Sequence, residues 1–597
     1  MRLSDYIVLS DDDDNESDSD TSSVTLGSDS DRLSFLCGNS RTVSPFSSLP
    51  AREVIDLTNA DGSHHGGFHD GDYLTDEGYK ALLENWAQAA AASPPGIEAV
   101  QKKRLDEACV DGIVYVPGQS IELHDDTFLR ITSVWENPDG EIYFEGRRLR
   151  LLESLEDQNG NEDGETILTY FPRWQNELVW MLDEVDDVPL GIVRHFVTIH
   201  FTNHSPMDQD PHKILYPSHL YCRLKERPGT SVEYLTFEEA DVKHRIPPAT
   251  LRNSWRGETT PFGSNKGVPV IDLDDIDDNP GPIVKARARR KYTFGDGFCG
   301  AGGVSCGAET AGLHIKWAFD MSPHAAVTYR LNFSTAECEE SDIFSFLTND
   351  EEFMRVDVTH GSPPCQTWSP AHTIPGPNDD ANSACIFSCG DLIRKAKPRI
   401  HTVEETDGLI ARHKQFFLAV IRDFIDTGYS VRWAVLNCLM YGVPQKRKRL
   451  VIIASGPGET LPTMPKPTHG LPGSGLRDLV TINQVISNIP LGAPNHDIDG
   501  ATRRGARKAP FDGNGQAHTI TCGGGTNNYH PSGERNFTRR EAACLQTFPL
   551  SFRFGPAEIS KQIGNAVPPA LARAIYREVI KTLQETDERE LREIGDR

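Results

Sequence analysis

The sequence lacks the features of a membrane-spanning or secreted protein. It has no run of about 18 apolar residues, so we expect no transmembrane helix and no membrane association. The acidic run Asp11–Asp14 stands where a secretory signal would carry basic and then apolar residues. The 12 cysteines follow no repeated spacing, and Cys385 and Cys389 have no second pair to complete a zinc site, so we expect no metal. Reduced thiols of a cytosolic or nuclear protein are the natural interpretation.

The chain also lacks the net positive charge that is typical of nucleic-acid-binding proteins, since its formal net charge is −27. The acidity is unevenly distributed. Residues 1–290 contain 53 acidic and 27 basic side chains and carry −26, whereas residues 291–597 contain 34 and 33 and carry −1. A basic cleft in the second part is compatible with this balance, so the net charge does not exclude DNA.

Residues 1–75 are rich in Asp and Ser and poor in aromatic residues, which predicts a disordered acidic tail. Three short apolar islands beside acidic residues interrupt the polar parts of the chain. Their apolar residues are Ile7, Val8, Leu9, Val54, Ile55, Leu57, Val270, Ile271 and Leu273. The islands resemble SUMO-interaction motifs, which add a strand to the edge of the modifier's sheet. The resemblance implies SUMO or a sumoylated chromatin protein as a partner.

Residues 105–240 form a region of short apolar runs between turn signals, which predicts a small, mostly-β domain. Residues 137–140, Asn-Pro-Asp-Gly, are typical of a hairpin turn. Short stretches around Arg147, Val179 and Tyr221 resemble the bromo-adjacent homology (BAH) domain, which implies a histone or another chromatin protein as a ligand. An unrelated β-barrel is the alternative. The Gly-, Pro- and Asp-rich residues 257–290 predict a linker.

Residues 291–585 repeat a pattern of strand, loop and helix, which predicts an α/β fold with a Rossmann-like, mostly parallel sheet. A glycine-rich turn follows the first strand, where glycines let the backbone approach a ligand closely. Asp320 ends the second strand, where an acid would hold ribose hydroxyl groups, and Asp342 with Ile343 is placed to contact adenine. These residues predict a nucleoside-bearing cofactor, and on them alone NAD fits equally well.

Cys365 lies between prolines and small polar residues in Gly361–Ser369, a stiff loop that presents one thiol. A structural cysteine in a turn is the simpler alternative. A dehydrogenase needs no such thiol, whereas cytosine becomes reactive at C5 once a thiolate adds to C6. Glu404 would supply the carboxyl group that stabilises protonation of N3. The basic stretch containing Arg447 and Arg449 suits contacts to phosphates and bases.

These elements, in this order, resemble the DNA (cytosine-5) methyltransferase family over residues 292–585. The motifs that carry the resemblance are the glycine turn, Pro364-Cys365-Gln366, Gln445-x-Arg447-x-Arg449, residues 538–549 and residues 562–568. The resemblance implies S-adenosyl-L-methionine as the cofactor and double-stranded DNA, with the target cytosine flipped out, as the substrate.

The resemblance also assigns roles to single residues. Cys365 would be the nucleophile, Glu404 the acid at N3, and Arg447 and Arg449 the residues that hold the base or a nearby phosphate. A target-recognition region would span about 455–515. The cofactor pocket would contain Phe298, Gly300, Gly302, Gly303, Asp320, Asp342, Ile343, Asn565 and Val567.

The sequence departs from the family at Glu405. Most members have Glu-Asn-Val where this chain has Glu404-Glu405-Thr406, and the Asn normally braces the nucleophile loop. Two adjacent carboxyl groups would raise one pKa or repel the thiolate. The replacement resembles the fungal RID-like or Masc-type subgroup, which implies a nuclear protein of repeat silencing and sexual development. The alternative is a weak or inactive methyltransferase-like silencing factor that acts through BAH and SUMO contacts. RNA is a weaker alternative substrate.

Overall fold

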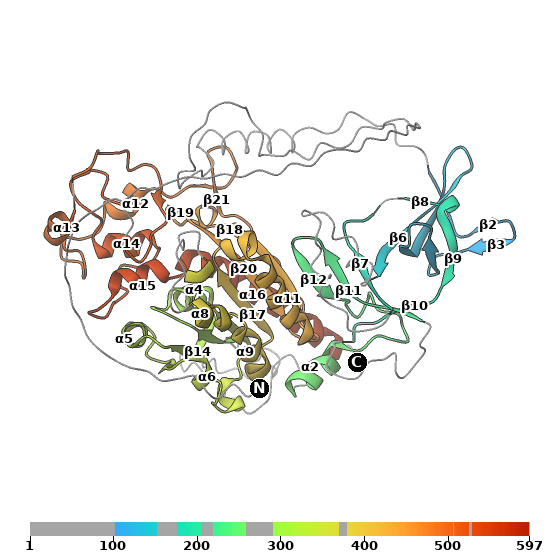
Figure 1. Ribbon diagram of the computed structural model, residues 1–597, viewed down its shortest axis with the longest axis horizontal. Coiled ribbons are helices and arrows are strands. Elements are labelled where there is room, and N and C mark those ends of the chain that lie inside the picture. Colours follow the sequence, from blue (N-terminus) through green and yellow to red (C-terminus); the bar gives the residue numbers. More distant parts are fainter. Residues whose placement is uncertain are drawn as a thin grey trace, which may run out of the picture. The chain divides into compact units, whose positions relative to one another are not determined.

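The computed structural model describes residues 102–151, 176–185, 187–204, 219–257, 291–368, 379–505, 507–523 and 528–595. The expected acidic tail, the three SUMO-like islands and all but the first residue of the expected linker lie outside these ranges. The described residues form an all-strand region followed by a short helix, and then an α/β region that ends in the long helix α16 (Figure 1). Among them, no helix combines the length and the apolar character needed to cross a membrane.

The first region is a β domain in which most neighbouring strands are antiparallel, whereas β11 pairs parallel with β7 and with β10. Buried apolar side chains such as Leu129, Ile131 and Val134 of β5 contribute to its core. The turn between β5 and β6 is the predicted Asn137–Gly140 hairpin, in which Gly140 takes a φ of +82°. The strands are β1 (Lys103–Leu105), β2 (Ala108–Val110), β3 (Ile113–Tyr115), β4 (Ser120–Leu123), β5 (Phe128–Glu136), β6 (Ile142–Leu151), β7 (Glu177–Met181), β8 (Val188–Pro189), β9 (Val193–Val197), β10 (Ile199–Phe201), β11 (Leu220–Arg227) and β12 (Ser231–Tyr234).

The second region contains a mixed sheet in the order β15–β14–β13–β16–β17–β20–β18. Neighbouring strands are parallel from β15 to β17, and β20 runs antiparallel to both β17 and β18. The structure therefore confirms the predicted Rossmann-like, mostly parallel sheet. Its strands are β13 (Thr293–Gly297), β14 (His314–Asp320), β15 (Glu337–Glu340), β16 (Val358–Gly361), β17 (Ile400–Glu405), β18 (Ser430–Asn437) and β20 (Lys448–Ser455).

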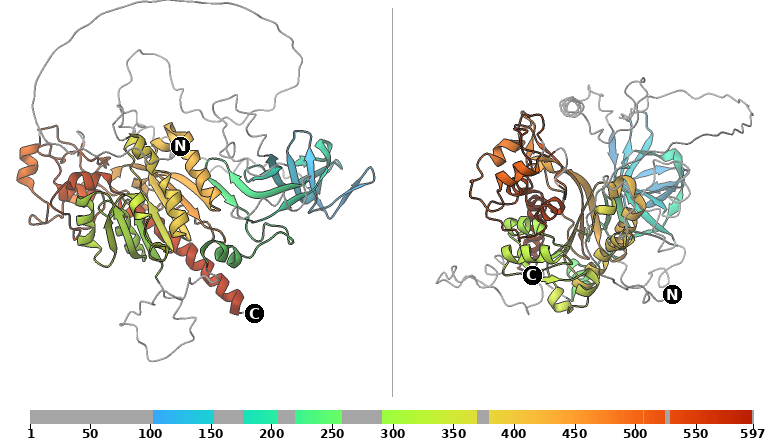
Figure 2. Two further views of the ribbon diagram at one scale, coloured as in Figure 1. Left: turned by 60° about the horizontal axis from the view of Figure 1, so that its bottom comes forward. Right: turned by 60° about the vertical axis from the view of Figure 1, so that its left-hand side comes forward.

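Helices cover both faces of this sheet, which explains why β20 reads as a continuous apolar run. One core packs α4 and α16 against side chains such as Phe294 and Ile453, and another packs α9 and α11 against side chains such as Val403 and Ile452 (Figures 1 and 2). The helices around the sheet are α4 (Gly303–Ala311), α5 (Pro323–Asn332), α6 (Ile343–Phe346), α7 (Glu351–Met354), α8 (Asp379–Cys385), α9 (Ser388–Ala396), α10 (Gly408–Arg412), α11 (Lys414–Asp426) and α16 (Pro569–Gly595).

The segment between β20 and α16 contains short elements and includes the expected target-recognition region. Thr481 and Thr538 begin two of its helices with capping boxes. Arg503 and Arg504 are exposed at the end of another. The elements are β21 (His469–Gly470), β22 (Arg477–Asp478), α12 (Ile482–Ile486), α13 (Ile498–Arg504), β23 (Ala517–His518), which pairs with β19 (Gln445–Lys446), α14 (Arg539–Leu545) and α15 (Ile559–Asn565).

The β domain and the α/β sheet share hydrogen bonds. Strand β12 pairs antiparallel with β18, and the Tyr234 hydroxyl donates to the Ile425 carbonyl at 2.8 Å. Helix α2 (Pro248–Arg256) also joins the α/β core, where the Trp255 indole donates to the Tyr429 hydroxyl at 3.1 Å. Strand β12 and helix α2 therefore contact the α/β region, whose last helix, α16, ends at Gly595.

Candidate active site

The candidate site lies at the carboxyl ends of the parallel strands, where the strand order changes direction. Strand β13 pairs with β14 on one side and with β16 on the other, and in open α/β sheets such a point opens a crevice above it. The loop after β13 is the glycine turn, and the loop after β16 contains Cys365. The topology therefore brings together the glycine turn and the Cys365 loop, which the sequence patterns predicted separately as parts of a site.

Close packing requires glycine at two positions of the turn. Gly302 has a φ of +89°, and a Cβ there would lie 2.4 Å from the Phe333 ring. A Cβ on Gly303 would lie 2.3 Å from the carbonyl oxygen of Val567. The first turn of α4 is therefore in contact with the segment after α15, so the structure places the predicted residues Gly303 and Val567 side by side.

The other predicted cofactor residues surround this turn. Asp320 is at the tip of β14 and accepts hydrogen bonds from the amides of Gly300 and Ser322, both at 2.8 Å. Phe298 has a φ of +57° and packs edge-to-face on Phe319, with ring centroids 5.2 Å apart. Asp342 caps α6 through the amides of Phe344 and Ser345, and Ile343 is buried in the cluster beside Phe298.

Asp296 belongs to this group and was not singled out from the sequence. Its side chain is fully buried, and Oδ2 accepts from the Ser305 hydroxyl at 2.6 Å. Its Oδ1 has no hydrogen-bond partner among the described residues. Burial raises the pKa of Asp296 to about 7. The sequence feature that could have identified Asp296 is an acidic residue between two glycines at the end of a strand.

These features fit a nucleoside-bearing cofactor. The turn has no side chain at Gly300, Gly302 or Gly303, and the open space beside Gly300 would admit a ligand against the backbone. Each oxygen of Asp320 accepts one hydrogen bond, so each keeps a further acceptor position for a hydroxyl group.

The Cys365 loop is half-buried, with Cys365 itself partly exposed, and Trp368 packs it against the segment that follows β17. A Cβ on Gly408 would lie 2.0 Å from the Trp368 carbonyl oxygen, which also accepts from Arg412 at 3.2 Å. The Trp368 ring packs against His413 and Phe416. Burial, and then the charge of Glu405, raises the pKa of the Cys365 thiol to about 12. The resting thiol is therefore protonated at neutral pH.

The two adjacent acids at the end of β17 have different partners. Arg449 on β20 forms an ion pair with Glu404, with Nε 2.6 Å from Oε1. Glu405 is fully buried, and its Oε2 accepts from the Thr406 amide at 3.0 Å. Among the described residues, Arg449 therefore forms its ion pair with Glu404, and Glu405 forms none.

Arg447 connects the basic stretch to the cofactor side of the site. Its guanidinium donates to the carbonyls of Ile520, Gly564 and Ala566 at 3.2–3.4 Å. Burial, and then Arg449, lowers its pKa to about 10. Asn565, at the end of α15, is exposed and accepts from the Cys522 thiol at 2.7 Å. Arg447 therefore fixes the backbone on both sides of Asn565, a role that its sequence context did not predict.

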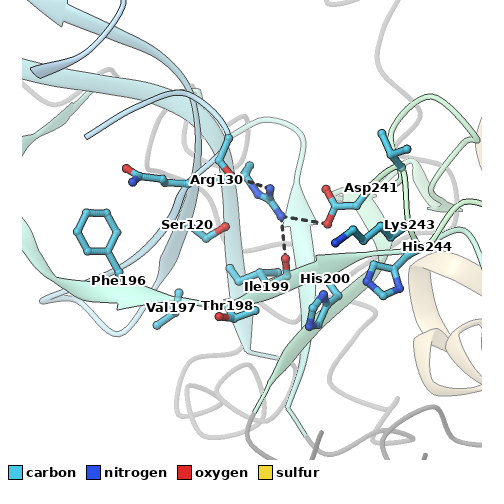
Figure 3. A pocket seen from close by; sticks show the side chains of 13 residues that line it. Ser120, Arg130, Phe196, Val197, Thr198, Ile199, His200, Asp241, Lys243 and His244 are labelled. Carbon is cyan, nitrogen blue, oxygen red and sulfur yellow. Dashed lines mark hydrogen bonds and ion pairs between the residues drawn. The ribbon is translucent and has the colours of Figure 1, made fainter. Parts of the chain in front are cut away.

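The β domain has a cavity of about 500 Å³ of its own (Figure 3). Arg130 donates to the Ile199 carbonyl at 2.7 Å and to Asp241 at 3.2 Å. Lys243, His200 and His244 also line it, so basic side chains outnumber the single acid. Burial, and then His244, lowers the pKa of His200. Within the described ranges, no group of three or more His, Cys, Asp or Glu side chains is arranged to hold a metal ion.

Comparisons with known proteins concern the α/β region. A family model described as C-5 cytosine-specific DNA methylase matches residues 292–498 and 496–581. The chain is 34% identical over 312 residues to the type II methyltransferase M.NgoFVII of Neisseria gonorrhoeae, covering 46% of this chain and 82% of that protein. It is 32% identical over 311 residues to the type II methyltransferase M.AplI of Arthrospira platensis, covering 48% and 86%. The crystal structure of the S. pombe Dnmt2 methyltransferase matches with 17% identity and a TM-score of 0.36, covering 49% of this chain and 99% of that one.

Proposed function

The chain belongs to the C-5 cytosine-specific DNA methylase family, and from this premise we propose how its residues carry out the reaction. The enzyme methylates cytosine in DNA and uses S-adenosyl-L-methionine. When bound, the cofactor supplies an electrophilic methyl group. Gly300, Gly302, Gly303, Asp320 and the Asn565–Val567 segment would hold it, because they line the same end of the sheet.

The observation that carries the mechanism is the meeting of Cys365, Glu404 and Arg449 at one end of the sheet. In our proposal the Cys365 thiol gives its proton to water and its sulfur adds to C6 of a flipped-out cytosine, while N3 takes up a proton. Glu404 stabilises the proton at N3, and Arg449 holds that carboxyl in place. C5 then takes the methyl group and loses its hydrogen as a proton to water. The electron pair of that C–H bond restores the C5–C6 double bond and expels sulfur as a thiolate, which takes up a proton, and N3 loses the proton that it held.

A covalent trap tests the nucleophile. In DNA that carries 5-fluorocytosine, C5 bears fluorine in place of the hydrogen that must leave as a proton, so the adduct persists. We expect the wild type to crosslink to this DNA in the presence of cofactor, and Cys365→Ser not to. Cys109→Ser, at an exposed cysteine of the β domain, is the matched control and should crosslink normally. Equal crosslinking by Cys365→Ser and the wild type would remove Cys365 as the nucleophile.

We further propose that the protein acts in the nucleus of a fungus, in silencing of repeated DNA and in sexual development. The support is the Glu404-Glu405-Thr406 sequence and its resemblance to the RID-like or Masc-type subgroup. Microscopy of the tagged protein tests the location, and exclusion from nuclei would contradict it. Repeat methylation in a strain carrying Cys365→Ser tests the role, and unchanged methylation would refute it.

Partners are proposed for the β domain and the apolar islands. The β domain would bind a histone or another chromatin protein, and its cavity with Lys243 and His244 is the place to test. We expect Lys243→Glu with His244→Ala to weaken nucleosome pull-down, and unchanged recovery would move the interaction elsewhere. The islands would bind SUMO, and undiminished binding after all nine apolar residues are changed to Ala would exclude it.

The second candidate function is a methyltransferase-like silencing factor with little activity of its own. The observation that favours it is Glu405, a buried acid in the position of a bracing Asn. Methyl transfer from labelled cofactor to unmethylated, hemimethylated and repeat-bearing DNA separates the two functions, with Cys365→Ser as the blank. Wild-type transfer no higher than this blank would favour the silencing factor.

A further inference from the structure

Glu405 is a buried acid that forms no ion pair with the other described residues. It is completely buried at the end of β17, where its Oε2 accepts a hydrogen bond from the Thr406 amide. Its Oε1 has no hydrogen-bond partner among the described residues. An ionised carboxylate in such a place would be strongly disfavoured, and a protein normally avoids the cost by keeping the group protonated.

The groups that face Glu405 do not change this conclusion. Glu404 and Arg449 interact with it from β17 and β20, and the thiols of Cys365 and Cys389 lie within reach of its charge. The Nε of Arg449 is already paired with Glu404. Burial, and then Glu404, raises the pKa of Glu405 well above its ordinary value.

The nucleophile loop lies against the same part of the chain and also has unsatisfied polar atoms. The Trp368 carbonyl contacts Gly408 and Arg412, three and seven residues after Glu405. Thr367 Oγ1 and Thr406 Oγ1 are buried and have no hydrogen-bond partner among the described residues. Glu405 is also the first of the charged groups that affect the Cys365 thiol, ahead of Glu404. A proton donor at Glu405 would therefore lie close enough to the reactive sulfur to affect it.

We propose that Glu405 is a positioning residue that works as a neutral carboxylic acid, with its hydroxyl donating to the nucleophile loop and its carbonyl oxygen accepting. This proposal rests on the proposed role of Cys365. A neutral carboxyl group offers one donor and one acceptor at the end of a short side chain, as a carboxamide does. Glu405 thereby braces the nucleophile loop in place of the Asn that most of the family has at this position. Its ionisation would place a negative charge beside the sulfur and oppose the thiolate.

The test compares Glu405→Gln, a neutral isostere, with the wild type. The rate of Cys365 alkylation by iodoacetamide is followed from pH 6.5 to 9.5 by mass spectrometry of its peptide, and no DNA is needed. Alkylation follows the thiolate, so its rate rises about tenfold per pH unit while the surroundings stay constant. We expect equal rates near pH 7, because both side chains are then neutral, and a slower rise in the wild type at any higher pH at which Glu405 ionises, because the carboxamide of the variant cannot. Glu351→Gln, an exposed acid on α7, should match the wild type throughout.

One outcome would overturn the neutral state. A constant excess of about tenfold in Glu405→Gln at every pH would mean that Glu405 is already ionised at pH 7.

Turnover gives a second, separate readout. We expect Glu405→Ala to lose at least about tenfold in kcat with KM for DNA unchanged, and Glu405→Gln to restore it. Loss of kcat in both variants, with unchanged thermal unfolding, would refute the neutral role. If the wild type forms no crosslink to 5-fluorocytosine DNA, the proposed function fails, whereas the alkylation profile still decides the state of Glu405.

Discussion

Replacing Arg399 with Met should destabilise the protein strongly, because this buried arginine holds two buried acids. Arg399 immediately precedes β17, the strand that carries Glu404. Its guanidinium donates to both oxygens of Glu459 at 2.8 and 2.9 Å and to both oxygens of Asp587 on α16 at 3.1 and 2.7 Å. The side chains of Arg399, Glu459 and Asp587 are 3%, 1% and 8% exposed. Water cannot replace these contacts.

The magnitude follows from what the substitution leaves behind. Removing one partner of a buried ion pair costs about 3–5 kcal/mol, because the remaining charge stays buried without compensation. Arg399→Met leaves two such charges, although Tyr292 still donates to Asp587 and Arg252 lies 3.9 Å from Glu459. We therefore expect a loss of about 3–5 kcal/mol in the free energy of unfolding, a large part of the stability of a typical domain.

Urea unfolding followed by tryptophan fluorescence measures this loss, and its pH dependence identifies the cause. Burial already raises the pKa of Asp587, and in the variant, without Arg399, the folded state binds a proton at this carboxyl group more readily than the unfolded state. Such groups stabilise the fold below their unfolded pKa values and lose that contribution as the pH rises. The deficit should therefore be full at pH 8 and shrink toward pH 5.

Arg422→Met is the matched control, since Arg422 is 40% exposed and lies 3.8 Å from Asp426 on the surface of α11. Its loss should stay below about 1 kcal/mol. A loss below about 1 kcal/mol in Arg399→Met, or a deficit that does not change with pH, would refute the account of the buried network.

Further predictions concern the site itself. Gly303→Ala should weaken cofactor binding by about tenfold or more in calorimetry, because its Cβ would meet the Val567 carbonyl at 2.3 Å, whereas Gly492→Ala meets nothing within 4 Å and should bind normally. Glu404→Gln should lower kcat by about 10²-fold, far more than Glu405→Gln near pH 7, and the reverse order would exchange the roles of the two acids. Burial raises the pKa of Asp296 from 3.8 to about 7, so wild-type stability should fall as the pH rises across that interval. Asp296→Asn should remove up to about 1.4 kcal/mol per pH unit of this slope, and an unchanged slope would show that Asp296 does not cause it.

The sheet and the placement of its loops could be predicted from the sequence because they depend on local patterns. Strand β14 contains a largely apolar run that ends at Asp320, and the residues that end parallel strands must meet at one edge of the sheet. Asp320 and the Cys365 loop reach that edge for this reason. This pattern depends only on neighbouring residues, so the sequence alone predicts it.

Contacts between distant segments could not be predicted in this way. The Tyr234 amide donates to the Ser430 hydroxyl across 196 residues, and Arg399 reaches Asp587 across 188. Neither contact produces a periodic pattern in the sequence. The residue type alone also does not distinguish a buried arginine from an exposed one. The same reason explains why Arg447, read as a base or phosphate contact, is found bound to three backbone carbonyls beside the cofactor segment.

The two acids show where sequence reasoning reaches its limit. Adjacent residues of a strand point to opposite faces, so Glu404 and Glu405 must have different surroundings whatever the fold. Which of them meets Arg449 depends on the register, in which Glu404 lies opposite Val451 and Glu405 opposite Leu450. A shift of one residue would exchange the faces and give Glu405 the guanidinium. The register therefore decides which acid is paired and which is buried without a cation, and the Glu404→Gln and Glu405→Gln comparison tests this register as well as the chemistry.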